Sequence, residues 1–258
     1  MSTKLFEGIV FGPVNSRRLG VSLGVNLLPS EGKLCSFDCI YCECGYNAEH
    51  NMDRRMPGRD DVRRALEDRL SSMRAAGERL DVITFAGNGE PTLNPDFGGV
   101  IEDTLMLRDI YFPDVKVSVL SNATKVWDDS VFDALCKVDN NILKLDTAVD
   151  STFRALNVPS NPELTVARQI EGLARFGGKF ILQTMFVKGM HNAGVIDNTT
   201  DVEVAALRDA VAFLKPESVM VYSIARDTPE SALSKVQRPE LERIASVLRE
   251  TGVPVSVY

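Results

Sequence analysis

Three cysteines near the start of the chain have the type and spacing needed to hold an inorganic cluster. They are Cys35, Cys39 and Cys42, in the order C-x3-C-x2-C, and Tyr41 comes directly before the last of them. A 4Fe-4S cluster has four irons, so three thiolate ligands leave one iron free to bind a small molecule. The spacing therefore predicts a 4Fe-4S site that binds a second molecule at its open iron.

Other uses of these thiols stay open on spacing alone. A structural zinc site needs four ligands, and Cys44 could supply the fourth, although a gap of one residue after Cys42 is poor geometry for chelation. A zinc-binding, iron–sulfur-binding or redox-sensing protein without enzymatic activity is therefore the alternative. A disulfide framework is disfavoured because the chain is long and has five cysteines, an odd number. Cys136 stands alone in a predicted helix, where we expect a small core residue.

A second motif, Gly-Asn-Gly-Glu-Pro at residues 87–91, directly follows a predicted strand at 82–86. Glycines at the carboxyl end of a strand let a ligand approach the backbone closely. Ligands of parallel α/β sheets bind at that end of the strands. The motif is not G-x-G-x-x-G, so it does not predict a dinucleotide site. By itself it predicts a tight turn where a ligand has room to bind.

The composition is that of an ordinary globular protein, with 44% hydrophobic and 25% charged residues over 258 positions. A net charge of −7 argues against a broad nucleic-acid surface, which needs many basic side chains. The two histidines, His50 and His191, form no short metal-ligand motif. We find no secretion signal and no apolar run of membrane-spanning length, so we expect a cytoplasmic protein with reduced thiols and no membrane partner.

Short apolar runs alternate with amphipathic stretches along the chain, which is typical of strands connected by helices. The predicted strands are 21–28, 82–86, 115–120, 142–145, 180–187, 218–224 and 255–257, and the predicted helices are 60–76, 97–108, 129–136, 162–176, 202–214 and 240–250. About six strand–helix units result, after a small leading strand at 5–14. This pattern predicts an α/β fold with a mainly parallel sheet, either a partial (β/α)6 barrel or an open doubly wound sheet.

Together, the two motifs resemble the signature of the radical S-adenosylmethionine (SAM) superfamily, C-x3-C-x-aromatic-C followed by Gly-Gly-Glu-Pro, with Asn88 in place of the first glycine. The resemblance implies a partial (β/α)6 barrel with a small N-terminal strand extension. One domain, 1–258, would contain this extension at about 1–28, a cluster loop at 29–45 and the barrel up to residue 258. The implied cofactors are a 4Fe-4S cluster and SAM, in a metal-binding enzyme of the oxidoreductase type.

The resemblance also implies which residues contact SAM. In the superfamily the glycine-rich backbone holds the methionine ammonium, and polar groups at later strand ends reach the ribose and carboxylate. Carried over to this sequence, the SAM-binding set is Tyr41, Gly87, Asn88, Gly89, Glu90, Ser121, Asn122, Asp146, Gln183, Tyr222 and Ser223. Tyr41 could stack on the adenine, since aromatic faces stack well with bases. It could equally pack the cysteine loop onto the core.

The N-terminal run Gly-Pro-x-x-Ser-Arg-Arg-Leu-Gly-x-Ser-Leu-Gly, at residues 12–24, is similar to that of radical SAM proteins related to wyosine-forming tRNA enzymes. This implies reductive cleavage of SAM to a 5′-deoxyadenosyl radical, with flavodoxin or ferredoxin as electron donor. The radical would abstract hydrogen from a tRNA base or a small metabolite. Guanidinium groups suit carboxylates and phosphates, so Arg17 and Arg18 are candidate substrate anchors.

Overall fold

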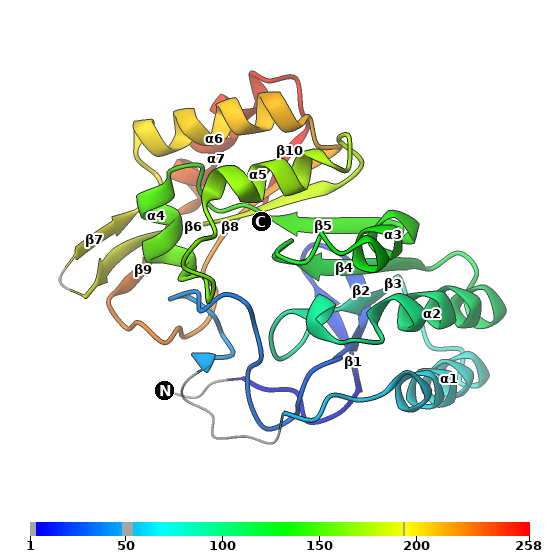
Figure 1. The fold of residues 1–258 in the computed structure, drawn as a ribbon. Coiled ribbons are helices and arrows are strands. Elements are labelled where there is room, and N and C mark those ends of the chain that lie inside the picture. Colours follow the sequence, from blue (N-terminus) through cyan, green and yellow to red (C-terminus); the bar gives the residue numbers. More distant parts are fainter. Residues whose placement is uncertain (1–3, 48–53, 193) are drawn as a thin grey trace.

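The computed structural model describes residues 4–47, 54–192 and 194–258, which form one ten-stranded sheet and the helices packed on it (Figure 1). The strands lie in the order β1-β2-β3-β4-β5-β6-β8-β10, and β7 and β9 pair with β6 outside this path. Neighbours from β2 to β10 along this path are parallel, whereas β1 pairs antiparallel with β2 at one edge. The bounds are Val10–Ser16 (β1), Gly20–Val25 (β2), Val82–Phe85 (β3), Lys116–Ser121 (β4), Asn140–Lys144 (β5), Ile181–His191 (β6), Gly194–Asp197 (β7), Ser218–Ser223 (β8), Leu233–Lys235 (β9) and Val255–Val257 (β10).

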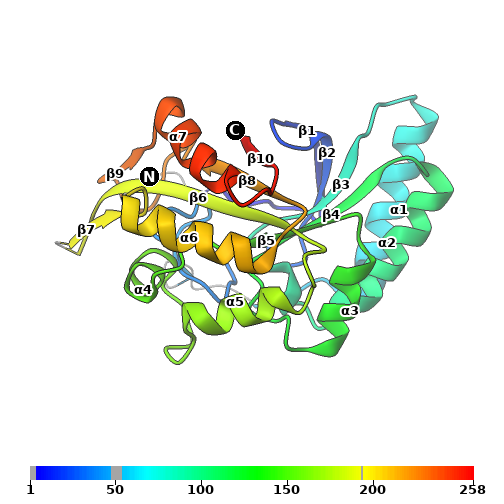
Figure 2. The same cartoon turned by 90° about the horizontal axis from the view of Figure 1, so that it is seen from above.

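Helices cover the outer face of this sheet (Figure 2). They are Arg59–Ala75 (α1), Phe97–Tyr111 (α2), Asp129–Lys137 (α3), Asp150–Asn157 (α4), Val166–Ala174 (α5), Asp201–Leu214 (α6) and Arg238–Arg249 (α7). In α1, the apolar side chains of Val62, Leu66, Leu70 and Met73 recur at helical spacing and are all buried, so this otherwise polar sequence packs as an amphipathic helix. None of the helices in the described ranges is both long and apolar enough to cross a membrane.

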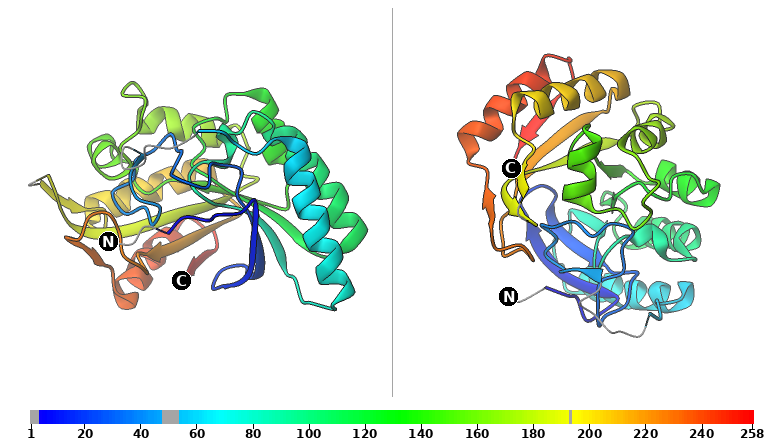
Figure 3. Two further views of the ribbon diagram at one scale, coloured as in Figure 1. Left: turned by 90° about the horizontal axis from the view of Figure 1, so that it is seen from below. Right: turned by 60° about the vertical axis from the view of Figure 1, so that its left-hand side comes forward.

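The sheet curves into a barrel that does not close (Figure 3). Strands β1 and β10 are its two edges, and no ladder of hydrogen bonds joins them in the described part of the chain. The turn between β1 and β2 instead reaches β8, where the Arg18 guanidinium stacks over the Tyr222 ring at 4.5 Å from its centre. The partial barrel predicted from the sequence is confirmed, while the single domain over 1–258 and its subdivision stay predictions.

Several local predictions differ from the structure. The helix expected at 162–176 is only α5, because the Thr165 side chain caps its first turn by accepting a hydrogen bond from Arg168 N at 3.2 Å. The preceding segment contains α4, which the sequence pattern did not reveal. Strand β6 runs on to His191, where it pairs with β7 and β9. Cys136 is exposed on α3, so the expectation that it is a core residue was wrong.

Candidate iron–sulfur and cofactor site

The loop that carries the three cysteines follows β2 at the carboxyl end of the parallel strands, and the side chain of Asn47 fixes its shape. Asn47 Oδ1 accepts a hydrogen bond from Cys35 N at 3.0 Å. Its Nδ2 donates to the carbonyl oxygens of Cys35 and Phe37 at 3.1 and 3.3 Å. Phe37 and Ile40 anchor the loop in the core, where both are buried. The backbone between the cysteines is therefore held by the protein itself.

A buried lysine lies beside the three cysteines. The Lys33 side chain is only 1% exposed, and its Nζ is 2.9 Å from Asp38 Oδ1. Burial lowers the pKa of Lys33, but the negative charge of the three cysteine thiolates and the hydrogen bond with Asp38 outweigh it and raise the pKa overall. The side chain is therefore a cation that stabilises negative charge at this place.

Two asparagine side chains donate hydrogen bonds to the cysteine sulfurs. Asn122 Nδ2 is 3.6 Å from Cys35 Sγ, and Asn157 Nδ2 is 3.5 Å from Cys39 Sγ. Burial raises the pKa of both thiols. A coordinated metal would deprotonate them. The amide donors could then stabilise the thiolates, since hydrogen bonds to sulfur are one means by which proteins tune iron–sulfur clusters.

The donor set fits a 4Fe-4S cluster. Each thiolate of such a cluster binds a different iron, so three thiols of one loop can serve as ligands without meeting at a single point. The two amide donors and the buried Lys33 next to these thiols would offset the negative charge of the thiolates.

Cys44 is placed as a hydrogen-bond donor next to this loop. Its Sγ is 3.5 Å from the carbonyl oxygen of Gly87. A hydrogen bond from the Cys44 thiol lowers the pKa of Cys42 to about 6 and raises the pKa of Cys44 itself. Cys44 thus lies within hydrogen-bonding reach of Cys42, the third cysteine of the C-x3-C-x2-C motif.

The glycine motif is bonded directly to the residue that precedes the first cysteine. Leu34 N donates to the Asn88 carbonyl at 2.8 Å, and Glu90 N donates to the Leu34 carbonyl at 3.1 Å. Gly89 lies between them at φ +135°, and a Cβ atom there would be 1.9 Å from the Leu34 oxygen. This second glycine is therefore required by the close approach of two backbone segments.

Glu90 joins the glycine motif to the end of β4. Its carboxylate accepts hydrogen bonds from Thr92 N and Oγ1 at 3.1 and 2.6 Å, from Ser121 Oγ at 2.8 Å and from Asn122 N at 2.7 Å. Burial raises the pKa of Glu90, and these four hydrogen bonds oppose that shift. The same contacts hold Asn122 in the position from which it reaches Cys35.

Asn88, which replaces a glycine of the superfamily motif, holds the N-terminal segment. Its Oδ1 accepts from Phe6 N at 2.8 Å, and its Nδ2 donates to the carbonyl oxygens of Phe6 and Pro29 at 2.9 and 2.8 Å. Its backbone N–H donates to Asn26 Oδ1 at 3.1 Å, and the residue is fully buried. Both donors of the side chain and its oxygen thus have partners within the protein.

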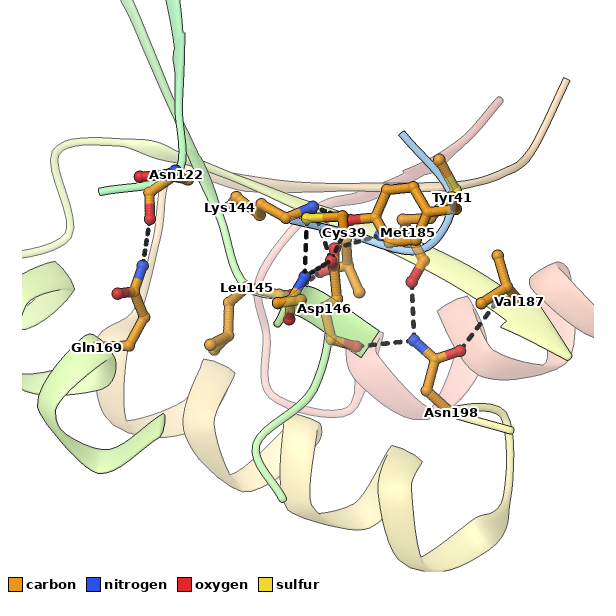
Figure 4. Close-up of polar contacts among 12 residues, drawn as sticks. Cys39, Tyr41, Asn122, Lys144, Leu145, Asp146, Gln169, Met185, Val187 and Asn198 are labelled. Atoms are coloured by element: carbon orange, nitrogen blue, oxygen red, sulfur yellow. Dashed lines mark hydrogen bonds and ion pairs between the residues drawn. The ribbon is translucent and has the colours of Figure 1, made fainter. Parts of the chain in front are cut away.

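Asp146 is the centre of a buried network at the end of β5 (Figure 4). Its Oδ2 accepts from the Tyr41 hydroxyl and from Asn157 Nδ2, the latter at 2.7 Å, and lies 2.7 Å from Lys144 Nζ. Its Oδ1 accepts from Met185 N at 3.0 Å. Lys144 is buried, which lowers its pKa, but the charges of Asp146 and Cys39 raise it overall. The network therefore ties the cysteine loop to β5 and β6.

The chemistry that this arrangement can support agrees with a comparison against protein families. The model of the Radical SAM superfamily matches residues 32–211, which include the cysteine loop and strands β3 to β7. The chain belongs to the radical SAM superfamily.

Two further comparisons find a relative in sequence and solved structures of the same fold. The UPF0026 protein MJ1312 of Methanocaldococcus jannaschii is 33% identical over 184 residues, which are 69% of this chain and 54% of that protein. The chain thus spans about half the length of this relative. Among solved structures, a radical SAM methyltransferase from Sphaerobacter thermophilus shares the fold, with a TM-score of 0.67 and 17% identity over 92% of this chain and 65% of that one. TYW1 with a lysine–pyruvate adduct bound has a TM-score of 0.61 and 13% identity, over 89% and 73% of the two chains.

In this radical SAM protein the residues predicted to contact SAM fall into separate groups. Residues of the glycine motif, with Ser121 and Asn122, gather beside the cysteine loop, and Tyr41 joins Asp146. Tyr222 lies under Arg18, and Gln183 faces the inside of the barrel. Ser223 Oγ donates a hydrogen bond to Phe186 O at 2.7 Å and accepts one from Val236 N at 2.8 Å. Contacts with SAM stay predictions for all of them.

The sequence argument missed the buried lysines and one asparagine of the site. Lys33 stands only two positions before Cys35, and Lys144 two positions before Asp146. Lysines are common on surfaces, so neither position signalled burial. Asn157 ends α4, an element that the sequence pattern did not reveal. Of the two candidate substrate anchors, Arg17 is exposed, whereas Arg18 is half-buried and faces the barrel.

Proposed function

We propose that this protein is a radical SAM enzyme in which Cys35, Cys39 and Cys42 hold a 4Fe-4S cluster. The observation that carries the proposal is the loop of three thiols with its two asparagine donors and buried Lys33. When bound, the cluster and SAM would supply one-electron cleavage of SAM to a 5′-deoxyadenosyl radical, which abstracts hydrogen from a substrate. The difficult chemistry belongs to the cofactors, and the protein supplies position and shielding from water.

The residues of this chain have separate tasks in the proposal. Asn122 and Asn157 donate hydrogen bonds to the thiolate ligands, and Lys33 offsets their negative charge. Glu90 and Asp146 hold the glycine motif and the strand ends in place, so that the polar backbone around SAM is already ordered before binding.

The partners in the proposal follow from the chemistry. One-electron cleavage needs an external reductant, for which we propose flavodoxin or ferredoxin. The substrate is a small molecule or a tRNA base. None of the five cysteines forms a disulfide bond, which suits the reducing, cytoplasmic location that we propose.

The test is anaerobic reconstitution of the full chain with iron and sulfide, followed by SAM and dithionite. We expect bound iron and sulfide in cluster proportion and formation of 5′-deoxyadenosine. Alanine at each of the three ligand cysteines should abolish both, whereas Cys136→Ala, on an exposed helix position, should change neither. A chain that binds zinc, assembles no cluster and leaves SAM intact would support the non-enzymatic metal-binding alternative instead.

A further inference from the structure

A cavity of about 160 Å³ lies inside the barrel, between the strands and the β1–β2 hairpin. Gln183 on β6 lines the cavity, and its register partner on the neighbouring strand β5 is Lys144. Lys144 is ion-paired with Asp146 at 2.7 Å and lies close enough to Cys39 for their charges to interact. The cavity is therefore next to the proposed cofactor site, on the inner side of the same strands.

One wall of the cavity is apolar and already formed. The rings of Phe6 and Phe11 stack with their centres 3.7 Å apart. Phe11 covers Gly24 so closely that a Cβ atom there would be 2.1 Å from the ring. Asn88 bonds both backbone polar groups of Phe6 and keeps the pair in place. Leu120, Ile142 and Met220 continue the apolar lining on the strands.

Among the described residues that line this cavity, Arg18 alone is charged. Its Nη1 is buried and has no hydrogen-bond partner in the described part of the chain. A buried N–H group without an acceptor is costly, so a ligand that supplies an acceptor to Nη1 is favoured there. The hydroxyl groups of Ser22 and Thr84, which also line the cavity, hydrogen-bond each other at 2.8 Å and so do not need a ligand as partner.

The hairpin turn sends Arg18 inward and Arg17 outward. Ser16 Oγ accepts hydrogen bonds from Arg18 N at 3.3 Å and Leu19 N at 3.2 Å, which fixes the turn. Arg18 then stacks on Tyr222, while Arg17 is exposed. The guanidinium is thus held in one orientation before any ligand arrives, which lowers the entropy lost on binding.

We propose that this cavity binds the substrate, and that the substrate is a small organic molecule whose single carboxylate is held by Arg18. As a statement about a substrate, it rests on the function proposed above. The planar guanidinium fork matches a carboxylate, and the apolar walls suit a short carbon body. The volume, about 160 Å³, is close to the ~150 Å³ of an engineered protein cavity that admits benzene, and below the ~300 Å³ typical of drug-sized ligands.

Charge favours this class over the alternatives. A base attached to a tRNA strand brings no anionic group into the cavity, because its phosphates stay outside with the backbone. A phosphate dianion calls for a second cation, and Arg18 is the charged residue among those described to line the cavity. One guanidinium with a buried N–H group free to donate therefore matches one carboxylate.

The experiment compares benzoate with its neutral isostere benzamide, measured by calorimetry on the full chain, first as purified and then reconstituted with saturating SAM and no reductant. We expect benzoate to bind the wild type at least tenfold more tightly than benzamide. Arg18→Gln should remove this preference, Arg18→Lys should keep part of it, and Arg17→Gln, the matched control, should stay within twofold of wild type. Circular dichroism establishes that each variant is folded.

Each remaining outcome overturns the proposal. Three of these outcomes are equal binding of the two probes, no binding of benzoate, and an equal effect of the Arg17 and Arg18 substitutions. The fourth is loss of benzoate binding when SAM is added, which would assign the cavity to the cofactor. The proposed function is tested separately by 5′-deoxyadenosine. If that product forms and benzoate fails, only the substrate class is wrong, whereas an Arg18-dependent benzoate site without SAM cleavage would leave a carboxylate site in a protein of another function.

Discussion

Replacing Asn88 by glycine would restore the Gly-Gly-Glu-Pro motif of the superfamily, yet we expect this change to weaken the protein. The Asn88 side chain makes three hydrogen bonds, with Phe6 N, Phe6 O and Pro29 O, at 2.8, 2.9 and 2.8 Å. Each contributes about 1 kcal/mol net. The greater backbone freedom of an unfolded glycine adds about 0.5–1 kcal/mol. The free energy of unfolding should therefore fall by about 3–4 kcal/mol in Asn88→Gly.

Urea unfolding measures the loss, and hydrogen exchange shows where it occurs. The Phe6 amide should lose its protection, since its acceptor is Asn88 Oδ1. Asn88→Ala removes the same hydrogen bonds without the glycine term, and so separates the two contributions. Asn192→Gly is the matched control: Asn192 is exposed at φ +48°, where glycine is well tolerated, so its stability should change by less than about 0.5 kcal/mol.

The reasoning would be refuted if Asn88→Gly changed the unfolding free energy by less than about 1 kcal/mol and left the Phe6 amide protected. A different result, loss of SAM affinity at unchanged stability, would mean that the Asn88 side chain contacts SAM instead of holding the N-terminal segment.

Three further changes test other parts of the site. Gly89→Ala places a Cβ atom 1.9 Å from the Leu34 oxygen and should at least halve the amount of iron bound after reconstitution. Gly98→Ala is the control, since its Cβ atom has no neighbour nearer than 3.6 Å, and it should bind as much iron as the wild type. Equal amounts of iron in the two variants would contradict the argument. Lys33→Met removes the buried cation beside the thiolates and should move the cluster's reduction potential to more negative values in an EPR-monitored titration, and an unshifted potential would count against that role. The pKa of Asp103 lies below its ordinary value because Arg59 bonds it at 2.7 Å. The pair therefore stabilises the fold above about pH 4, and this contribution is lost as the pH falls further. In Arg59→Gln the free energy of unfolding should depend less on pH in the acid range, and parallel pH curves for variant and wild type would exclude the effect.

The parts of the site that could be predicted from the sequence are those whose spacing carries chemistry by itself. Cys35, Cys39 and Cys42 are close in sequence, so their neighbourhood in space needs no knowledge of the fold. The alternation of strands and helices likewise predicted the parallel sheet. Apolar residues recur with different periods in helices and strands, and each helix that connects two strands must bury its apolar face against the sheet. Of the residues expected at the strand ends, Ser121 and Asn122 lie beside the glycine motif, whereas Tyr222 lies under Arg18.

The remainder could not be predicted because it depends on contacts between distant segments, or on which of several similar polar residues fixes a turn or caps a helix. Asn88 and Phe6 are 82 positions apart, and Tyr41 and Asp146 are 105 apart. Nothing local distinguishes Arg17 from Arg18, since only the Ser16-fixed turn decides which side chain faces inward. Thr165 looks like any polar residue in a helical stretch until its side chain is seen to cap α5.

The gap between the two edges of the sheet changes how the interior can be reached. A closed barrel must break a row of backbone hydrogen bonds to admit a molecule from its flank, and each broken pair leaves unsatisfied groups. Here a guanidinium stacked on a phenol ring is one contact that spans the gap. Displacing a side-chain contact of this kind breaks no backbone hydrogen bond, so opening the flank at this point leaves the strand pairing intact.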